Sequence, residues 1–218
     1  MSKRVVFDLG QVIVLSDSAA TQSGHLNEKE WEDFTERSEF WQLNEALDRG
    51  RSVSEVMRYV KDRHRGDIAI WERFFRNYRL SLTGVVPGMR TLISQLHANR
   101  VKTAVLSNWG VELFQHTLAA HPFIEDLGPR IVSGYEGIAK PDRAIFELAQ
   151  KRFHTPLKDM IMVDDREDNI AAAQAVGMEG IRFIDAEQLA QELASRGLLG
   201  PDQVRKVSKG LQSGRLAP

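Results

Sequence analysis

The amino-acid sequence predicts a three-layer α/β/α protein with a parallel sheet and an inserted helical subdomain. In the second half of the chain, short apolar stretches rich in β-branched residues alternate with segments of helical periodicity. This alternation is typical of βα units, which place their strands side by side in a parallel sheet. In the first half, one such strand is followed by about 65 residues without a convincing strand. The expected core is therefore Rossmann-like, with a helical insertion beside it.

The expected strands are five short apolar stretches, at residues 5–7, 101–106, 130–132, 160–163 and 181–183. Three helices are expected around them. Pro87 opens one that runs to about residue 99, and Pro141 opens another that runs to about residue 153, because proline is favoured in the first helical turn. Gly177 closes the third, at residues 169–176, as a C-terminal cap.

The insertion is expected to fold as an α-helical cap. Two capping boxes, Asn27 with Glu30 and Ser52 with Glu55, each open an amphipathic run. Aromatic residues would form the core of these helices: Trp31, Phe34, Phe40, Trp41, Trp71, Phe74, Phe75 and Tyr78. The expected division of the chain is a core at residues 1–15 and 83–200, the cap at 16–82, and a flexible C-terminal tail at 201–218.

Composition and charge exclude several classes of function. The 218 residues include 29 Lys and Arg against 30 Asp and Glu, and this net charge of -1 indicates no basic surface for nucleic acid or an anionic membrane. The absence of cysteine excludes disulfides, thiolate metal sites and a thiol nucleophile. No apolar run approaches the ~20 residues that span a bilayer, and the first one is interrupted at Asp8, unlike a signal peptide. We expect a cytoplasmic protein that binds a small molecule, with its oligomeric state left open.

Polar residues that follow four of the expected strands indicate a common site. In an open α/β sheet, ligands bind outside the carboxyl ends of the strands, so these residues would meet at one edge. They are Asp8, Ser107 with Asn108, Lys140, and Asp164 with Asp165. Each has an ordinary explanation when taken singly, as a turn residue, a helix cap or a solvated lysine. Their convergence on one edge favours a functional interpretation.

This set of residues suits phosphoryl transfer. Carboxylates without sulfur or imidazole form a hard oxygen site for Mg²⁺. Asp8 can then serve as a nucleophile that forms an aspartyl-phosphate. The hydroxyl, amide and backbone N–H groups of Ser107 and Asn108 can hold phosphoryl oxygens, and Lys140 supplies positive charge. Positioning and charge neutralisation are the main requirements of this reaction.

In these motifs the sequence resembles the haloacid dehalogenase-like (HAD) hydrolase superfamily. The motifs occur in the order of that family: Asp8-Leu9-Gly10, Leu106-Ser107-Asn108, Lys140-Pro141-Asp142, and Val163-Asp164-Asp165 followed by Asp168-Asn169. The resemblance covers residues 4–196 and extends to the small α-helical cap class, since the insertion directly follows the first motif. Within that class the chain looks most like the α-D-glucose-1-phosphate phosphatase type.

The resemblance implies a role for each residue of the metal site. Asp8 would be the nucleophile and a magnesium ligand, and Gly10 would offer its main-chain carbonyl to the metal. Asp165 would be the direct carboxylate ligand of the fourth motif, and Asp164 would bind either directly or through water. Asp168 would orient Lys140 or a metal-bound water.

The same resemblance implies that Ser107 and Asn108 bind the phosphate and that Lys140 braces both the phosphate and Asp8. The chain departs from most phosphatases of the family at Gly10, where they carry an aspartate that protonates the leaving alcohol and then activates water. Such acid–base help is typically worth ~10²–10⁴-fold. The glucose-1-phosphate type shares the glycine. Asp17, His25 or a residue of the cap could replace the acid, whereas Gln11 could only orient a water.

The predicted function is a magnesium-dependent phosphatase of small phosphorylated metabolites, with sugar phosphates among the candidate substrates. The nearest alternative is a metal-independent 2-haloacid dehalogenase, although those enzymes lack the acid pair of Asp164 and Asp165. A signalling receiver domain has similar residues in a different order and no such insertion. A catalytically silent binding module of the same fold is the third alternative.

Specificity is expected to depend on the cap, because the turn at residues 47–51 breaks two helices and can hang over the site. Arg49, Arg51, His25 and Trp41 are candidates for facing the substrate, with solvated charges and a core aromatic as the alternative explanation. Trp109, which directly follows the second motif, either lines the pocket or packs under the cap.

Overall fold

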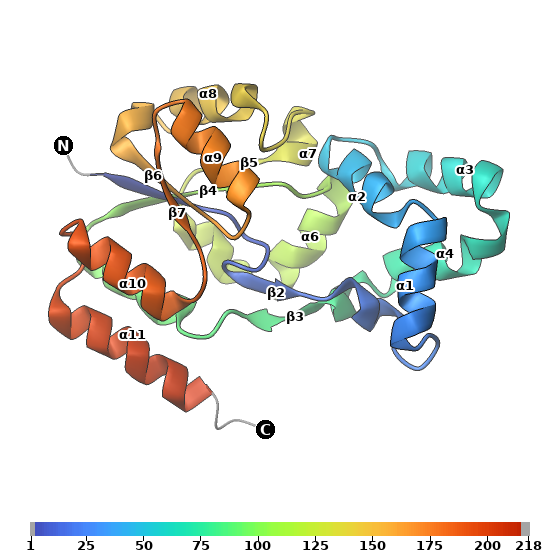
Figure 1. Ribbon diagram of the computed structural model, residues 1–218, viewed down its shortest axis with the longest axis horizontal. Coiled ribbons are helices and arrows are strands. Elements are labelled where there is room, and N and C mark those ends of the chain that lie inside the picture. Colours follow the sequence, from blue (N-terminus) through green and yellow to red (C-terminus); the bar gives the residue numbers. More distant parts are fainter. Residues whose placement is uncertain (1–2, 215–218) are drawn as a thin grey trace.

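The computed structural model describes residues 3–214, with side chains described as far as residue 210. Its centre is a five-stranded parallel sheet in the order β5-β4-β1-β6-β7, covered by helices on both faces (Figure 1). The strands are β1 Arg4–Phe7, β4 Lys102–Ser107, β5 Arg130–Val132, β6 Met160–Asp164 and β7 Glu179–Arg182. All five strands predicted from the sequence are present, with bounds that differ by two residues at most. The predicted fold class is confirmed.

The first strand, β1, lies in the middle of the sheet and pairs with β4 on one side and β6 on the other. The chain winds outward from β1 through β4 to β5 and then returns to the opposite side of β1 for β6 and β7. The carboxyl end of β1 is therefore the topological switch point, where ligands of doubly wound folds bind.

Alternation along the strands divides the hydrophobic core into two layers. Val5 and Phe7 of β1 point to one face and Val6 points to the other, and all three are fully buried. The first face is covered by α5 Met89–Ala98, α6 Val111–Ala120 and α10 Ala186–Ser195. The second face is covered by α8 Arg143–Arg152 and α9 Glu167–Ala175. A short helix, α7 Ser133–Glu136, follows β5.

A group of helices lies beyond one end of the sheet and forms the expected cap (Figure 1). These helices are α1 Glu28–Arg37, α2 Phe40–Asp48, α3 Val53–Arg63 and α4 Ile68–Arg76. Both predicted capping boxes are present: the Asn27 side chain accepts from the Glu30 N–H, and Ser52 does the same for Glu55. Short 3₁₀ helices complete this part of the chain, at Ser18–Gln22, Arg65–Asp67 and Tyr78–Ser81.

Two short strands that the sequence did not reveal connect the sheet to these helices. β2 Val14–Ser16 and β3 Leu82–Val85 pair antiparallel, with an irregularity at Leu15/Ser16. Each is only three or four residues long and mostly half-buried, so neither shows the alternation that predicts a strand. They straddle the predicted cap boundaries, and the exact division of the chain stays a prediction.

Aromatic rings fill the interior of the helical group, as expected. Phe40 lies 5.0 Å from Trp31, 5.1 Å from Trp71 and 5.0 Å from Phe74, measured between ring centroids. Trp41 is the exception among the predicted core aromatics. Its side chain is 58% exposed, because it is adjacent to Phe40 on α2 and points away from the bundle interior.

The flexible tail expected at residues 201–218 is a helix as far as the structure describes it. α11 Pro201–Gly214 packs against α10 and α5, and Val207 is fully buried. The Gln203 amide also donates to the Gln95 carbonyl over 3.3 Å. The prediction was wrong because it weighed the polar composition and overlooked Val204 and Val207, whose spacing gives one helical face an apolar stripe. Residues 215–218 lie outside the described part of the chain.

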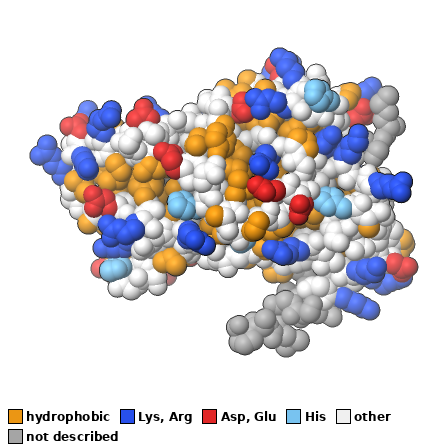
Figure 2. Space-filling model, turned by 180° about the vertical axis from the view of Figure 1, so that it is seen from behind, with side chains coloured by type: hydrophobic (Ala, Val, Ile, Leu, Met, Phe, Trp, Pro, Cys, Tyr) orange, Lys and Arg blue, Asp and Glu red, His pale blue; other side chains and the backbone are white. Residues whose placement is uncertain are grey.

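The surface carries both signs of charge. On the face shown in Figure 2, basic and acidic side chains are interspersed with hydrophobic ones, which agrees with a net charge of -1. Within residues 3–214, no helix is both long enough and apolar enough to cross a membrane.

Candidate active site

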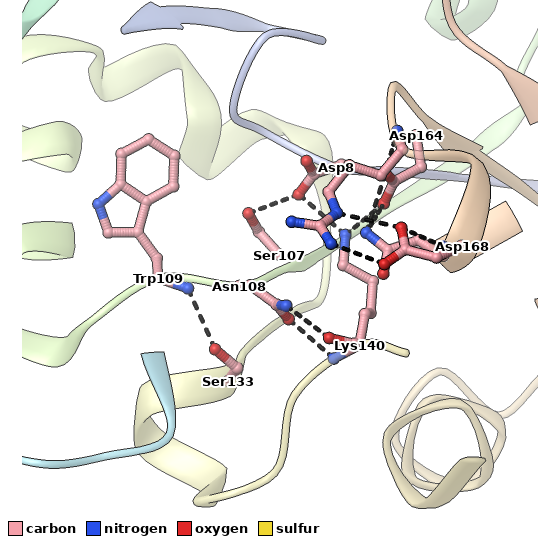
Figure 3. Close-up of polar contacts among 10 residues, drawn as sticks. Asp8, Ser107, Asn108, Trp109, Ser133, Lys140, Asp164 and Asp168 are labelled. Carbon is pink, nitrogen blue, oxygen red and sulfur yellow. Dashed lines mark hydrogen bonds and ion pairs between the residues drawn. The ribbon is translucent and has the colours of Figure 1, made fainter. Parts of the chain in front are cut away.

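Asp8 lies one residue beyond the end of β1, where the backbone leaves the sheet. Its N–H still donates to the Val163 carbonyl over 2.9 Å, so the residue continues the sheet register. Its side chain is 12% exposed, and its carboxylate is held from two sides (Figure 3). The Ser107 hydroxyl donates to Asp8 Oδ1 over 2.7 Å, and Lys140 Nζ lies 3.0 Å from the same oxygen. Residues far apart in sequence thus meet at the switch point.

Lys140 is buried between two carboxylates. Besides Asp8, its ammonium contacts Asp164 Oδ2 at 2.6 Å. Asp164 ends β6 and is fully buried; it also accepts from the Asn169 amide at 3.0 and 3.1 Å and from the Arg166 N–H at 2.9 Å. Burial acts to lower the pKa of Lys140, but the two carboxylates outweigh it and raise this pKa above its usual value. The lysine therefore keeps its charge in a buried position.

The Asn108 side chain forms two hydrogen bonds with the main chain of Lys140. Its amide donates to the Lys140 carbonyl over 2.8 Å, and its oxygen accepts from the Lys140 N–H over 2.9 Å (Figure 3). Both ends of the amide are thereby committed to the main chain of the lysine. These hydrogen bonds fix the segment that carries Lys140 against the end of β4. Phosphate binding by Asn108 stays a prediction.

A cluster of three acids lies around this lysine. One carboxylate oxygen from each of Asp8, Asp164 and Asp165 lies within 4.8 Å of the others. Burial raises the pKa of Asp8 to about 6, opposed by Lys140 and reinforced by Asp164. Burial and the neighbouring Asp164 likewise raise the pKa of Asp165. Burial is the main cause of both pKa shifts, and the negative charge of Asp164 adds to each.

The cluster fits a divalent cation in charge and in ligand type. Three carboxylates and one ammonium leave two negative charges, which one divalent ion would neutralise. All candidate ligands are oxygens, the type that Mg²⁺ prefers. Asn169 adds a further oxygen, since its Oδ1 is buried and has no hydrogen-bond partner among the described residues. Asp165 is half-buried and lines the adjacent cavity together with Gly10, whereas Asp164 lies behind it.

Asp168 does not contact Lys140. Its carboxylate forms a two-point ion pair with Arg166, with contacts of 3.1 Å from Nε and 2.6 Å from the terminal nitrogen (Figure 3). Of the two roles expected for Asp168, orienting the lysine was therefore wrong, and orienting a metal-bound water stays a prediction. That position is filled by Asp164, because Lys140 reaches the strand end rather than the first turn of α9.

A cavity of about 620 Å³ opens above the acid cluster. The core contributes Asp8, Gly10, Trp109, Lys140 and Asp165 to its walls. The cap contributes one face of α2 and parts of the neighbouring segments: Trp41, Gln42, Asn44, Glu45, Asp48 and Phe74. The walls combine aromatic and polar side chains, which suits a small molecule with both kinds of surface.

Of the proposed specificity residues, Trp41 and Trp109 line this cavity. Arg49 pairs with Asp142 of the core at 2.6 Å and with Glu45. Arg51 lines a separate surface hollow, and His25 is exposed and lies outside the set of lining residues.

Asp17, one of the possible replacement acids, is exposed and caps a 3₁₀ helix by accepting from the Ala19 N–H. Asp17 is not among the residues that line the cavity. Gln11 lines the cavity, but its amide donates to the Ser16 carbonyl over 2.7 Å.

Asp48 is the residue of this site that the sequence did not single out. It is the last residue of α2 and lies in the turn that was expected to hang over the site. Its side chain lines the same cavity as Asp8. Burial, and then the charge of Asp8, raise its pKa to about 7. The only sequence signal was the helix-breaking Arg49-Gly50 that follows it. This pair marks a turn but does not indicate which way the Asp48 side chain points.

Curated relatives match parts of the chain. The sesquiterpene phosphatase astK of Aspergillus oryzae is 34% identical over 113 residues, which are 51% of this chain and 56% of that protein. A probable pseudouridine-5'-phosphatase of Drosophila melanogaster is 28% identical over 137 residues, 57% of this chain and 59% of that protein. Drimenol cyclase drtB of Aspergillus calidoustus is 35% identical over 63 residues, or 29% of this chain and 12% of that protein. The chain thus spans less than two thirds of each.

Solved structures share the fold at low sequence identity. An HAD family enzyme of Bacteroides thetaiotaomicron, in complex with magnesium and inorganic phosphate, superposes with a TM-score of 0.64 at 18% identity, covering 85% of this chain and 96% of that one. An HAD family hydrolase of Deinococcus radiodurans with bound phosphate and sodium superposes with a TM-score of 0.61 at 17% identity. The match covers 92% of this chain and 98% of that one. A dehalogenase with an intermediate complex also superposes with a TM-score of 0.61 at 17% identity. The match covers 84% of this chain and 85% of that one. The fold alone therefore does not distinguish phosphatase from dehalogenase.

The family itself is shown by a direct match. The family model for haloacid dehalogenase-like hydrolases matches residues 3–177, which include all four predicted motifs. The chain belongs to this family of hydrolases.

Proposed function

We propose that the protein is a magnesium-dependent phosphatase of small phosphorylated metabolites that uses Asp8 as its nucleophile. The observation that carries this proposal is the buried cluster of Asp8, Lys140, Asp164 and Asp165 at the floor of the cavity. Its excess negative charge suits a cation, and its ammonium suits a phosphoryl group. A halide displacement needs neither the acid pair nor a divalent ion.

In the proposed reaction, a carboxylate oxygen of Asp8 attacks phosphorus and the bond to the alcohol oxygen breaks. The resulting aspartyl-phosphate is then hydrolysed by water, which regenerates Asp8. Lys140 and Ser107 favour the ionised form of Asp8, although burial raises its pKa to about 6. The carboxylate is thus largely ionised at neutral pH. Lys140 would also stabilise charge on the phosphoryl oxygens.

The proposed magnesium ligands are the carboxylates of Asp8 and Asp165, the main-chain carbonyl of Gly10, and Asp164 directly or through water. When bound, the ion would neutralise phosphoryl charge and orient the group for in-line attack. The half-buried position of Asp165 beside the cavity favours it as the direct ligand of the fourth motif. Asp164, which is already bonded to Lys140, Asn169 and a main-chain N–H, would serve mainly to hold the lysine.

The substrate class is proposed from the cavity and from the relatives. A volume of about 620 Å³ suits a small phosphate ester. Two of the matched relatives carry phosphatase names, one for a sesquiterpene and one for pseudouridine 5'-phosphate. Sugar phosphates, including glucose 1-phosphate, are also candidates.

The test is turnover by the purified protein with magnesium on a panel of sugar 1-phosphates, sugar 6-phosphates, nucleotides, isoprenoid phosphates and 2-haloacids. We expect release of phosphate from at least one ester and its loss in Asp8→Asn. Release of halide without magnesium would favour the dehalogenase. No turnover across the panel, or full activity of Asp8→Asn, would leave the silent binding module as the better explanation.

A further inference from the structure

The proposed reaction requires a proton for the leaving alcohol, and the core offers no acid where one would be expected. At Gly10, a Cβ atom would lie 3.7 Å from the ring of Trp109, which is ordinary contact. The structure therefore has room for the Cβ atom of a side chain at position 10. Lys140 and Asp164 are committed to each other, and Asp168 is paired with Arg166. The proton donor must come from another wall of the cavity.

Asp48, in the cap, has a carboxyl group that could supply this proton. It ends α2 and lines the same cavity as Asp8. It is close enough to Asp8 for the two charges to interact, and the Gly110 N–H bonds to its carboxyl group. Glu45, the other acid of α2 at the cavity, is mostly exposed and paired with Arg49. Asp48 therefore faces the space where a leaving group on the phosphorus would lie.

The backbone of Asp48 is fixed against the core by contacts on both sides. The Ser133 hydroxyl donates to the Asp48 carbonyl over 2.5 Å and accepts from the Trp109 N–H over 3.1 Å. Leu47 packs so closely on Gly110 that a Cβ atom there would lie 3.0 Å from the Leu47 Cβ. Arg49 forms its ion pair with Asp142 immediately after. The main chain that carries the Asp48 side chain is thus held against the core as well as by its own helix.

We infer that Asp48 is the general acid and base of the reaction, in place of the side chain missing at Gly10. The inference rests on the proposed phosphatase function.

In the first step, Asp8 bonds to phosphorus, the phosphorus–oxygen bond to the alcohol breaks, and the Asp48 carboxyl group gives its proton to the departing oxygen. In the second step, the Asp48 carboxylate accepts a proton from the water that attacks the aspartyl-phosphate. The bond between phosphorus and Asp8 breaks, phosphate leaves, and Asp48 is protonated again. The sum is one ester and one water converted to one alcohol and one phosphate.

The surroundings of Asp48 support both protonation states. Burial is the main cause that raises its pKa to about 7, followed by the charge of Asp8, while the Gly110 N–H and Lys140 oppose the rise. A donor and acceptor for neutral pH needs a pKa in this range. Tyr78 is a further titratable group that interacts with Asp48, but burial raises its pKa, and its hydroxyl accepts from the Trp109 ring N–H over 2.8 Å.

The experiment compares kcat/KM for two esters in wild type and Asp48→Asn: 4-nitrophenyl phosphate, whose leaving group needs no proton, and an alkyl phosphate, whose leaving group does. We expect Asp48→Asn to lower kcat/KM for the alkyl ester by about 10²–10⁴-fold and to change that for the nitrophenyl ester by less than about threefold. A burst of one nitrophenolate per site should also appear, because the second step has lost its base.

The matched control is Asp62→Asn, which makes the same replacement at an exposed position of α3 and should leave both values unchanged. Equal losses on the two esters in Asp48→Asn, or no loss on either, would overturn the assignment. The alkyl ester is chosen from those that the wild type hydrolyses in the substrate panel. If the wild type hydrolyses no ester of that panel, the proposed function is overturned, and the assignment with it.

Discussion

The sheet edge and the end of α2 face the same cavity, but they are held there by different forces. At the sheet edge, Lys140 is buried with Asp8 and Asp164, and every contact lies inside the protein. At the cap, the Arg49–Asp142 pair is more than a third exposed on both sides. The first arrangement depends on charges that water does not screen, whereas the second depends on main-chain contacts with a weakly held ion pair at its rim.

This difference separates the two halves of the proposed reaction. The proposed nucleophile and the groups proposed to bind phosphate and metal belong to the buried edge. The proposed proton donor, Asp48, belongs to the cap and reaches the site only because α2 ends on Gly110 and Ser133. Variants at the edge should therefore affect folding and chemistry together, while variants at the cap should affect them separately.

The largest expected effect is that of Lys140→Met, which leaves Asp8 and Asp164 buried without a counterion. Removing one partner of a buried pair costs about 3–5 kcal/mol of unfolding free energy. Urea denaturation without magnesium at neutral pH would measure this loss. Arg49→Met, the corresponding change at the cap, should cost less than about 1 kcal/mol. Similar losses in the two variants would contradict the distinction between the edge and the cap.

A smaller effect is expected within the acid cluster. Asp165→Ala should weaken magnesium binding by at least about tenfold, measured by calorimetry and by the concentration that half-activates turnover. Glu167→Ala is the control, because that side chain is exposed and pairs with Arg182. If the two variants bind magnesium equally well, Asp165 is not a ligand.

A further test places an aspartate in the core, at position 10, and asks whether it can replace Asp48 as the proton donor. In an Asp48→Asn background, Gly10→Asp has room for its Cβ 3.7 Å from Trp109 and should recover at least about tenfold in kcat/KM for the alkyl ester. Gly10→Asn in the same background has nearly the same shape but no acidic proton, so it should recover nothing. Equal recovery by both would indicate a steric effect.

The smallest expected effect concerns pH and the rim of the cap. Arg49 lowers the pKa of Asp142 in the folded protein, so the pair stabilises the fold above the usual pKa of an aspartate. This contribution is lost as pH falls through the lowered value. Asp142→Asn should therefore be less stable than wild type by under about 1 kcal/mol near neutral pH, and the difference should shrink below about pH 4. A difference that grows in acid would show that the pair is not its source.

The sequence predicts the edge of the sheet well and the cap poorly, for a physical reason. Asp8 and Asp165 directly follow strands, Ser107 ends one, and Lys140 lies in the loop that comes after β5 and α7. Parallel strands bring their carboxyl ends together at one edge of the sheet. Topology alone therefore groups these residues. Their grouping in the structure agrees with the prediction, while their chemical roles stay proposals.

Side-chain pairing is beyond such an argument. Asn108 bonds to the main chain of Lys140, and Asp168 bonds to Arg166, although motif position predicted other partners for both. Asp48 depends on where α2 ends relative to Gly110, a contact between segments about 60 residues apart. Local patterns contain no information about contacts at this separation.

The Ser133 hydroxyl has a consequence for how this pocket can evolve. It has a single proton, which it gives to the Asp48 carbonyl, while it receives the N–H of Trp109. A substitution that reshapes the pocket by shifting the Trp109 backbone must therefore also shift the segment that carries Asp48. The Ser133 side chain therefore constrains both the shape of the pocket and the position of the proposed proton donor. We expect substitutions that change substrate specificity to be accompanied by compensating substitutions at residue 133 or in the turn after α2.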